Sequence, residues 1–262
     1  MYKRQIIDLS ALTGEFSDHV WIYAGEGDDI IKSYENTRST IVGDAGNDYV
    51  EGGDGNDSVY GGDGDDTIDA GNGDNTITGD QGNDYLESGG GKDSLFGGSG
   101  DDILKAGGGN DVIYGADGWS GSKASSESTD IAVFSGASTD YKLSRATDTD
   151  FGYVYYIQDK RDGSPDGLDT LYDIDFLRFD DEEISVETYY NDIAKGGNLS
   201  ETITGTEVDD LIDGFGGDDT ISGLGGDDII IGGEGNDVID GGTGGNRLYG
   251  DNGDDLSLIH IS

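Results

Sequence analysis

Aspartates recur in this chain at intervals of nine residues, and most of them stand two residues after a glycine. The stretch GGDGNDSVY, Gly52–Tyr60, is followed directly by GGDGDDTID, Gly61–Asp69. A short carboxylate beside a glycine-rich turn offers oxygen atoms from its side chain and from backbone carbonyls. Hard cations take oxygen ligands, and calcium accepts them in a flexible geometry. The spacing therefore predicts a series of calcium sites.

Two runs of this nine-residue unit account for more than half of the chain. With Gly52 as position one, eight units follow one another without insertion from Gly43 to Tyr114, and an earlier copy occupies Ala24–Lys32. The second run starts at Gly196 and reaches Asp255. The acid at position six is the candidate metal ligand of each unit: Asp29, Asp48, Asp57, Asp66, Asp84, Asp93, Asp102, Asp111, Asp210, Asp219, Asp228, Asp237 and Asp255.

Other positions of the unit have structural roles. Glycine at position four permits a tight turn whose carbonyls point inward. Position eight is aliphatic in every unit of the first run, from Val50 to Ile113, which predicts a short strand that points this residue into a core. Asn75 and Asn246 stand at position six of two units, where an amide supplies oxygen without charge, so weak sites are expected there. Turns with Leu199 and Val208 in place of the position-four glycine should hold calcium poorly.

These residues resemble the RTX, or hemolysin-type, nonapeptide family, whose signature G-G-x-G-x-D-x-U-x describes calcium-binding repeats. The resemblance implies a parallel β-roll with two nonapeptides per coil and calcium between turns that stack two repeats apart. It also implies about nine calcium ions, secretion of the unfolded chain by a type I apparatus, and an extracellular or cell-surface location. The stacked position-six pairs would be Asp48–Asp66, Asp66–Asp84, Asp84–Asp102, Asp57–Asn75, Asn75–Asp93, Asp93–Asp111, Asp219–Asp237 and Asp237–Asp255.

The expected fold is all-β, with two parallel β-roll blocks separated by a small, mainly antiparallel β segment. Entry strands should lie in residues 6–23, the first roll in residues 24–118, the intervening segment in residues 119–192 and the second roll in residues 193–255. Residues 1–5 and 256–262 resemble a translated sequencing adapter, and we expect them to be foreign to the natural protein. An end cut there should leave the second roll open and favour self-association.

The composition of the chain excludes several classes of binding partner and metal site. A net charge of −43 excludes a basic nucleic-acid-binding surface, and the absence of cysteine excludes disulfides and thiolate metal sites. No apolar run approaches the roughly 18 residues of a membrane-spanning helix. So acidic and glycine-rich a chain would normally be disordered, which makes metal binding part of the expected fold.

No recognisable catalytic site is present, and we expect no enzymatic activity in this chain. Outside the C-terminal residues 256–262 the one histidine is His19, which is expected to lie near the start of the roll. Residues Asp162–Asp173 partly fit an EF-hand loop, but their flanks look like strands, so a hairpin turn is expected. Two functions remain open. The first is a calcium-binding module with a structural, adhesive or toxin-associated role, and the second is a calcium-dependent accessory region of a secreted enzyme.

Overall fold

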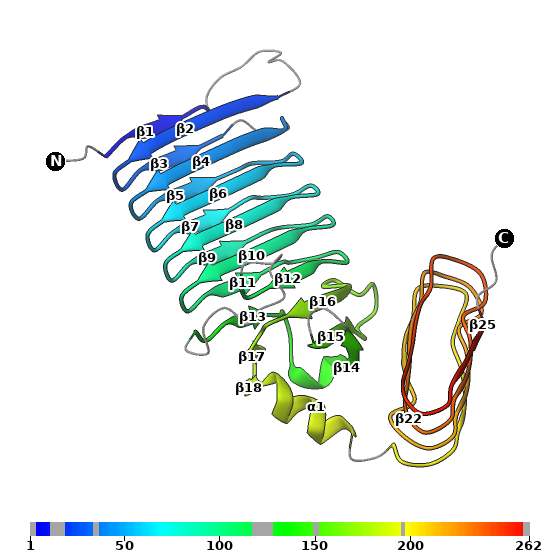
Figure 1. The fold of residues 1–262 in the computed structure, drawn as a ribbon. Helices are drawn as coiled ribbons and strands as arrows, with labels where there is room; N and C mark the ends of the chain where they lie inside the picture. The colour runs from blue at the N-terminus through cyan, green and yellow to red at the C-terminus, as the bar shows by residue number, and fades with distance from the viewer. Residues whose placement is uncertain are drawn as a thin grey trace. The chain divides into compact units, whose positions relative to one another are not determined.

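The computed structural model describes residues 4–10, 19–33, 37–116, 128–148, 152–194 and 197–258. The chain divides into two compact units, residues 1–141 with 159–186 and residues 142–158 with 187–262. Each unit contains one β-roll whose strands run parallel from coil to coil (Figure 1). The expected all-β fold with two parallel rolls is therefore confirmed.

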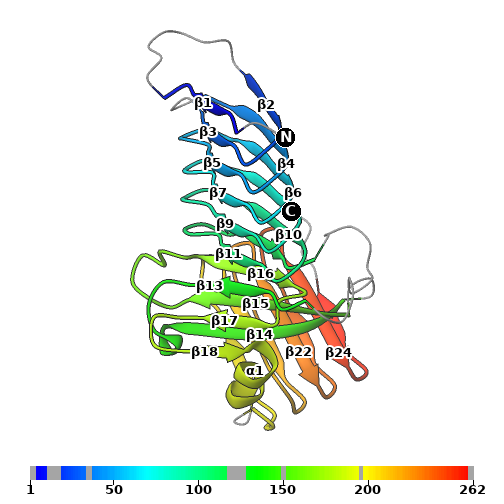
Figure 2. The same ribbon diagram turned by 90° about the vertical axis from the view of Figure 1, so that its left-hand side faces the viewer.

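The first roll has two sheets, one on each side of a thin core. In one of them β5 (Tyr49–Glu51) lies between β3 (Ile30–Lys32) and β7 (Thr67–Asp69), so that Val50 pairs with Ile31 and Ile68. Figure 2 shows the coils stacked along this roll. One sheet contains β1 (Ile6–Asp8), β3 (Ile30–Lys32), β5 (Tyr49–Glu51), β7 (Thr67–Asp69), β9 (Tyr85–Glu87), β11 (Ile103–Lys105), β13 (Ile131–Val133), β17 (Phe176–Arg178) and β18 (Glu183–Ser185), in that order.

The opposite sheet of the first roll is built from the alternate units. Here Val59 pairs with Ile41 and Ile77, and the same step of 18 residues links the later strands. Within the first unit its order is β16 (Leu168–Tyr172), β12 (Val112–Tyr114), β10 (Ser94–Ser99), β8 (Thr76–Gln81), β6 (Ser58–Asp63), β4 (Ser39–Ala45) and β2 (Val20–Glu26).

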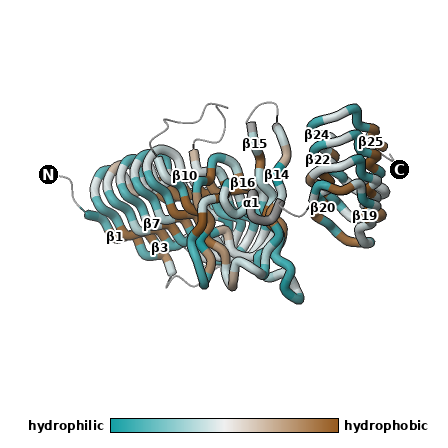
Figure 3. The backbone as a smooth tube through the Cα atoms, turned by 90° about the horizontal axis from the view of Figure 1, so that it is seen from below, coloured by the Kyte–Doolittle hydropathy of each residue, from teal (hydrophilic) through white to brown (hydrophobic). Residues whose placement is uncertain are grey.

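The core of the first roll consists of one row of aliphatic side chains from each of its two sheets. All position-eight residues from Val50 to Ile113 are 0% exposed. Figure 3 shows that hydrophobic residues lie in the strands, whereas the turns between them are mostly hydrophilic. One buried aliphatic residue per nine thus gives the roll a thin, continuous core.

The first roll extends beyond residue 118, where we expected it to end. Strand β13 pairs in parallel with β11, β16 with β12, and β17 with β13. Only the pair β17 and β18 is antiparallel among the pairings described for this unit. The intervening segment thus adds parallel strands to the roll beside the antiparallel pair, because a stacked coil requires only that a strand return in register, whatever the length of the connection. The EF-hand-like segment is bordered by β15 (Gly152–Asp159) and ends in β16, so its flanks are strands, as expected.

The second roll follows the helix α1 (Val186–Ala194). Its core contains Ile212, Ile221, Ile230 and Ile239, with Ile203 and Leu248 packed at the ends. One sheet has the order β19 (Thr202–Thr204), β21 (Thr220–Ser222), β23 (Val238–Asp240) and β25 (Leu256–Leu258), and the other β20 (Leu211–Asp213), β22 (Ile229–Glu234) and β24 (Arg247–Asn252). The unit also contains β14 (Tyr141–Asp148), apart from its first residue, and β15 apart from its last.

The two ends of the second roll differ from its middle. Leu199 and Val208 are 70% and 67% exposed and lack the positive φ of Gly217 and Gly226, which hold the same position in later units. At the other end β25 keeps the register and places Ser257 opposite Ile239, where other units have an aliphatic residue. In the described part of the chain, no helix has the length and apolar character needed to cross a membrane.

Candidate metal centre

The position-six residues form four columns, of which the two in the first roll are buried throughout and the two in the second roll are buried in part. In the first roll Asp29, Asp48, Asp66, Asp84 and Asp102 stack on one side, and Asp57, Asn75, Asp93 and Asp111 on the other, all at most 2% exposed. In the second roll Asp219, Asp228 and Asp237 are similarly buried, whereas Asp210, Asn246 and Asp255 are half-buried. The stacking pairs expected from the sequence are therefore the pairs that the structure brings together.

A backbone hydrogen bond holds one oxygen of each carboxylate. The N–H of Asp48 donates to Asp66 Oδ1 at 2.7 Å, and the N–H of Asp66 donates to Asp84 Oδ1 at 2.8 Å. The second roll repeats this, with Asp219 N–H donating to Asp237 Oδ1 at 2.8 Å. The preceding coil thus orients each carboxylate through Oδ1, and this hydrogen bond also fixes the position of the second oxygen, Oδ2.

The second oxygen, Oδ2, has no hydrogen-bond partner in eleven of the thirteen predicted aspartates. The eleven are Asp29, Asp48, Asp57, Asp66, Asp84, Asp93, Asp102, Asp111, Asp219, Asp228 and Asp237. A buried, unpaired carboxylate oxygen is costly unless a proton or a cation satisfies it. A regular row of such atoms is an arrangement that a row of bound cations would satisfy, and its oxygen ligands would suit calcium.

On one side of the first roll, a missing side chain creates the space beside the unpaired Oδ2 atoms of Asp48, Asp66, Asp84 and Asp102. A Cβ atom added to Gly79 would lie 2.2 Å from Asp84 Oδ2 and 2.5 Å from the carbonyl oxygen of Gly97. Gly61 has the same relation to Asp66, at 2.2 Å. Position-one glycine therefore lets a carboxylate oxygen of one coil and a carbonyl oxygen of the next converge.

The two position-six asparagines show which atoms lie opposite the Oδ2 position in the turn. Nδ2 of Asn75 donates to the carbonyl of Gly71 at 3.0 Å and to Oγ of Ser88 at 3.2 Å. Nδ2 of Asn246 likewise donates to the carbonyl of Gly241 at 2.6 Å. An amide can donate to these oxygens, but a carboxylate cannot, so an aspartate at this position needs a proton or a cation between its Oδ2 and these oxygens.

Burial changes the protonation of the stacked carboxyls when no cation is bound. Loss of hydration raises the pKa to about 6 at Asp48, Asp57 and Asp84, and to about 7 at Asp66 and Asp111. The pKa of Asp102 rises to about 8 because burial is joined by the charges of Asp130 and Asp84. The backbone N–H of the preceding coil lowers each pKa and so opposes the shift only in part.

Three further aspartates join the columns although they lie outside the nonapeptide frame. Asp102 N–H donates to Asp130 Oδ1 at 3.1 Å, Asp130 N–H to Asp175 Oδ2 at 3.1 Å, and Asp111 N–H to Asp169 Oδ1 at 2.8 Å. We did not predict them, because insertions separate them from the repeats. Each of the three is nevertheless followed by a short strand in which the second residue after the aspartate is apolar, as in the nonapeptides. This pattern, which could have identified them, reads DIAV, DFLR and DTLY.

The sites are made of single side chains and backbone rather than side-chain clusters. Among the described residues, no group of three or more His, Cys, Asp or Glu side chains converges on one point. His19, the one histidine singled out by the sequence, contacts Thr40 Oγ1 through Nε2 at 2.9 Å and stacks on Trp21. Calcium in this protein would therefore be held by position-six carboxylates together with turn carbonyls.

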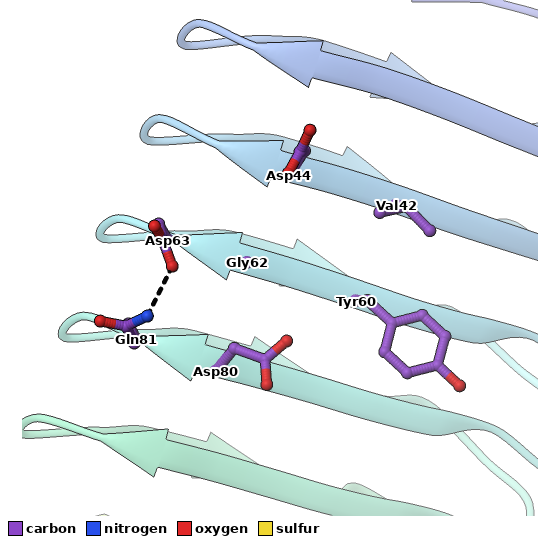
Figure 4. Close-up of a pocket in the computed structure, with 7 residues that line it drawn as sticks. All are labelled: Val42, Asp44, Tyr60, Gly62, Asp63, Asp80 and Gln81. Carbon is purple, nitrogen blue, oxygen red and sulfur yellow. Dashed lines mark hydrogen bonds between the residues drawn. The ribbon is translucent and has the colours of Figure 1, made fainter.

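A hollow on the outside of β4, β6 and β8 contrasts with these buried columns. Gly62 lies between Asp44 and Asp80 in register, and Gln81 donates to Asp63 at 2.7 Å beside them (Figure 4). The carboxylates of Asp44, Asp63 and Asp80 are exposed. Position-two and position-three acids therefore face solvent, whereas the position-six acids face the inside of the turns.

Replacing Asn75 by aspartate is expected to add calcium binding to its column. The substitution N75D removes the Nδ2 donor and places a charged oxygen beside the carbonyl of Gly71, between Asp57 and Asp93. Titration calorimetry should show tighter calcium binding or one additional ion, and the variant should be less stable than wild type in chelator.

The matched control for this substitution is N72D, which adds the same charge at an exposed position of the same turn. It should leave the calcium titration close to that of wild type. Equal calcium affinity and stoichiometry in N75D and wild type would contradict the assignment of the column.

Among the comparisons with known proteins, the match to one repeat family bears on this geometry. No curated protein matches the chain. Among solved structures, the chain is similar to the extracellular lipase LipA from Serratia marcescens, with 19% identity and a TM-score of 0.38, over 86% of this chain and 38% of the lipase. This chain therefore spans less than half the length of that lipase. The model of the RTX calcium-binding nonapeptide repeat matches residues 17–33, 38–68, 60–95, 87–118, 195–230 and 222–256. Because these matches cover more than half of the chain, the protein belongs to the family with RTX calcium-binding nonapeptide repeats.

Proposed function

We propose that this chain is a calcium-triggered folding module of an exported protein. The observation that supports the proposal is the set of eleven buried Oδ2 atoms without a partner. Each coil of the first roll adds two position-six residues and only two position-eight core residues. Calcium binding would therefore contribute much of the folding free energy, as in other small metal-dependent domains.

The role supported best for the chain is structural. RTX repeats are a calcium-binding module and not a catalytic one. We propose that the rolls form a stable, acidic, extracellular scaffold in an adhesive or toxin-associated protein. Calcium modules of extracellular proteins bind at about 0.1–1 mM, whereas cytosolic sensor sites bind at about 0.1–10 µM. A module of the extracellular class would stay unfolded before export and fold outside the cell.

A calcium titration of folding tests this proposal. Far-ultraviolet circular dichroism of the full chain should show a cooperative gain of β-structure with a midpoint between about 10 µM and 1 mM free calcium. The hydrodynamic radius, measured on the same samples, should fall over the same range. A midpoint below about 0.1 µM would contradict the proposal, because the chain would then fold before export.

A further inference from the structure

The segment 164–172, SPDGLDTLY, lies outside both runs of nonapeptides and outside the ranges that match the repeat model. Counted from Ser164, it has glycine at position four, Gly167, aspartate at position six, Asp169, and leucine at position eight, Leu171. Fifty-eight residues separate Asp169 from Asp111, its neighbour in the column, instead of the usual eighteen. Its position in the fold therefore has to be established from contacts.

Strand contacts place the 164–172 segment on the last complete unit of the first roll. Ile113 pairs with Leu171, and Val112 pairs with Thr170, in the parallel register of every earlier coil. Leu171 is 0% exposed, like the position-eight residues before it. The segment thus supplies a complete half-coil to the roll.

Its turn stacks on the turn of residues 107–111 as closely as two nonapeptide turns do. Gly167 has φ +77, and a Cβ added there would lie 1.4 Å from the carbonyl oxygen of Gly109. Leu168 N–H donates to Asn110 Oδ1 at 3.0 Å, which repeats the contact of Asp74 N–H with Asn56 Oδ1 at 2.9 Å. The backbone of this turn therefore follows the repeat geometry.

The carboxylates of Asp169 and Asp111 are also arranged like those of two stacked nonapeptides. Asp169 is 1% exposed and accepts the N–H of Asp111 through Oδ1 at 2.8 Å. Asp111 is also 1% exposed, and its Oδ2 has no hydrogen-bond partner. A buried, unpartnered oxygen therefore lies in the turn directly beside a second buried carboxylate, as it does between successive nonapeptides.

A polar network holds the 164–172 turn in place. Asp166 accepts hydrogen bonds from the N–H and the hydroxyl of Ser135, each at 2.8 Å, and from the hydroxyl of Tyr141. Arg161 lies 3.4 Å from Asp166 and pairs with Asp159 at 2.7 Å. Asp166 is thus occupied by neutral and cationic donors of the protein, which leaves Asp169 as the carboxylate of the turn available to a cation.

We propose that Asp169 and the 164–172 turn form an additional calcium site with Asp111, at the end of the first roll and outside the recognised repeats. The inference rests on the calcium binding of the proposed function. Asp169 plays the part that Asp111 plays for Asp93, and the turn contributes backbone carbonyls as the ligands. The site would extend calcium binding one half-coil beyond the nonapeptides.

The substitution D169N tests this site, with calcium itself as the probe. The number of ions bound per chain at saturation, measured by equilibrium dialysis, should fall by one in D169N relative to wild type. Asn75 occupies the equivalent place in the same column at 2% exposure, so the roll accommodates an asparagine there. The control D162N removes the same charge from an exposed residue of the same loop and should bind as many ions as wild type.

Circular dichroism of D169N in saturating calcium should match that of wild type. Equal numbers of ions in D169N and wild type would overturn the inference while leaving calcium binding by the repeats intact. Loss of several ions together with β-structure would overturn the claim of one local site. Absence of calcium binding in wild type would instead overturn the proposed function.

Discussion

Removing calcium is expected to unfold both rolls. In chelator the far-ultraviolet circular dichroism of the full chain should change from a β-type to a coil-type spectrum, and a few millimolar calcium should restore it. The physical reason is that position-six carboxylates such as Asp66 and Asp84 lie 1–2% exposed with an unpaired oxygen, next to one another in a column. Stacked like charges about 4.8 Å apart repel, and a cation between them reverses the sign of this interaction.

Magnesium provides the control for calcium removal. It requires a smaller, nearly octahedral shell and gives up its water reluctantly, so it should not restore the β-type spectrum at equal concentration. A chain that remains β-rich in chelator would show that aliphatic packing and backbone hydrogen bonds hold the rolls without metal, and would contradict the expectation.

Protonation of the buried carboxyls is expected to stabilise the folded rolls in part when calcium is absent. In calcium-free buffer, lowering the pH from 8 to 5.5 should increase β-structure. An unfolded aspartate has a pKa near 3.9. In the folded roll without metal, burial raises the pKa to about 6 at Asp84, about 7 at Asp66 and about 8 at Asp102. The folded state thus binds more protons between about pH 4 and 8, and its stability is lost as the pH rises through this window.

With calcium the pH dependence should have the opposite sign. Calcium binds the deprotonated carboxylates, so its apparent affinity should fall as the pH decreases from 8 to 5.5. Circular dichroism against pH, recorded in calcium-free buffer and at fixed subsaturating calcium, measures both trends. Equally unfolded calcium-free samples at pH 5.5 and pH 8 would contradict the assignment of raised pKa values to the buried columns.

The sequence predicted the register of the rolls because one residue type fulfils one physical requirement at each position. Position-eight residues such as Val59 and Ile68 had to be apolar to enter the core, and they are fully buried. Position-six residues such as Asp66 and Asp84 had to recur every eighteen residues to stack, and their backbone and side-chain atoms are joined by a hydrogen bond. Periodicity alone was therefore enough to align the columns.

The nine-residue period did not predict the aspartates that rejoin the columns after an insertion in the sequence. Asp130 follows Asp102 by 28 residues and Asp169 follows Asp111 by 58, yet both occupy the columns. Lengthening a connection adds little to the free-energy cost of closing the loop, so the fold tolerates such insertions. A search for the short pattern that follows Asp169, rather than for a fixed interval, would have found these residues.

The eighteen-residue step between stacked strands has a mechanical consequence. Each coil of the first roll contacts the coils before and after it through parallel ladders such as β5 with β3 and β7. Tension along the chain would therefore detach coils one at a time from an end, as in other quasi-one-dimensional folds. A detached coil of eighteen residues releases about 60–65 Å of chain, whereas it occupied about 4.8 Å along the roll. The roll thus holds a large length of chain in a short distance, and cations bound in its turns would set the load at which that length is released.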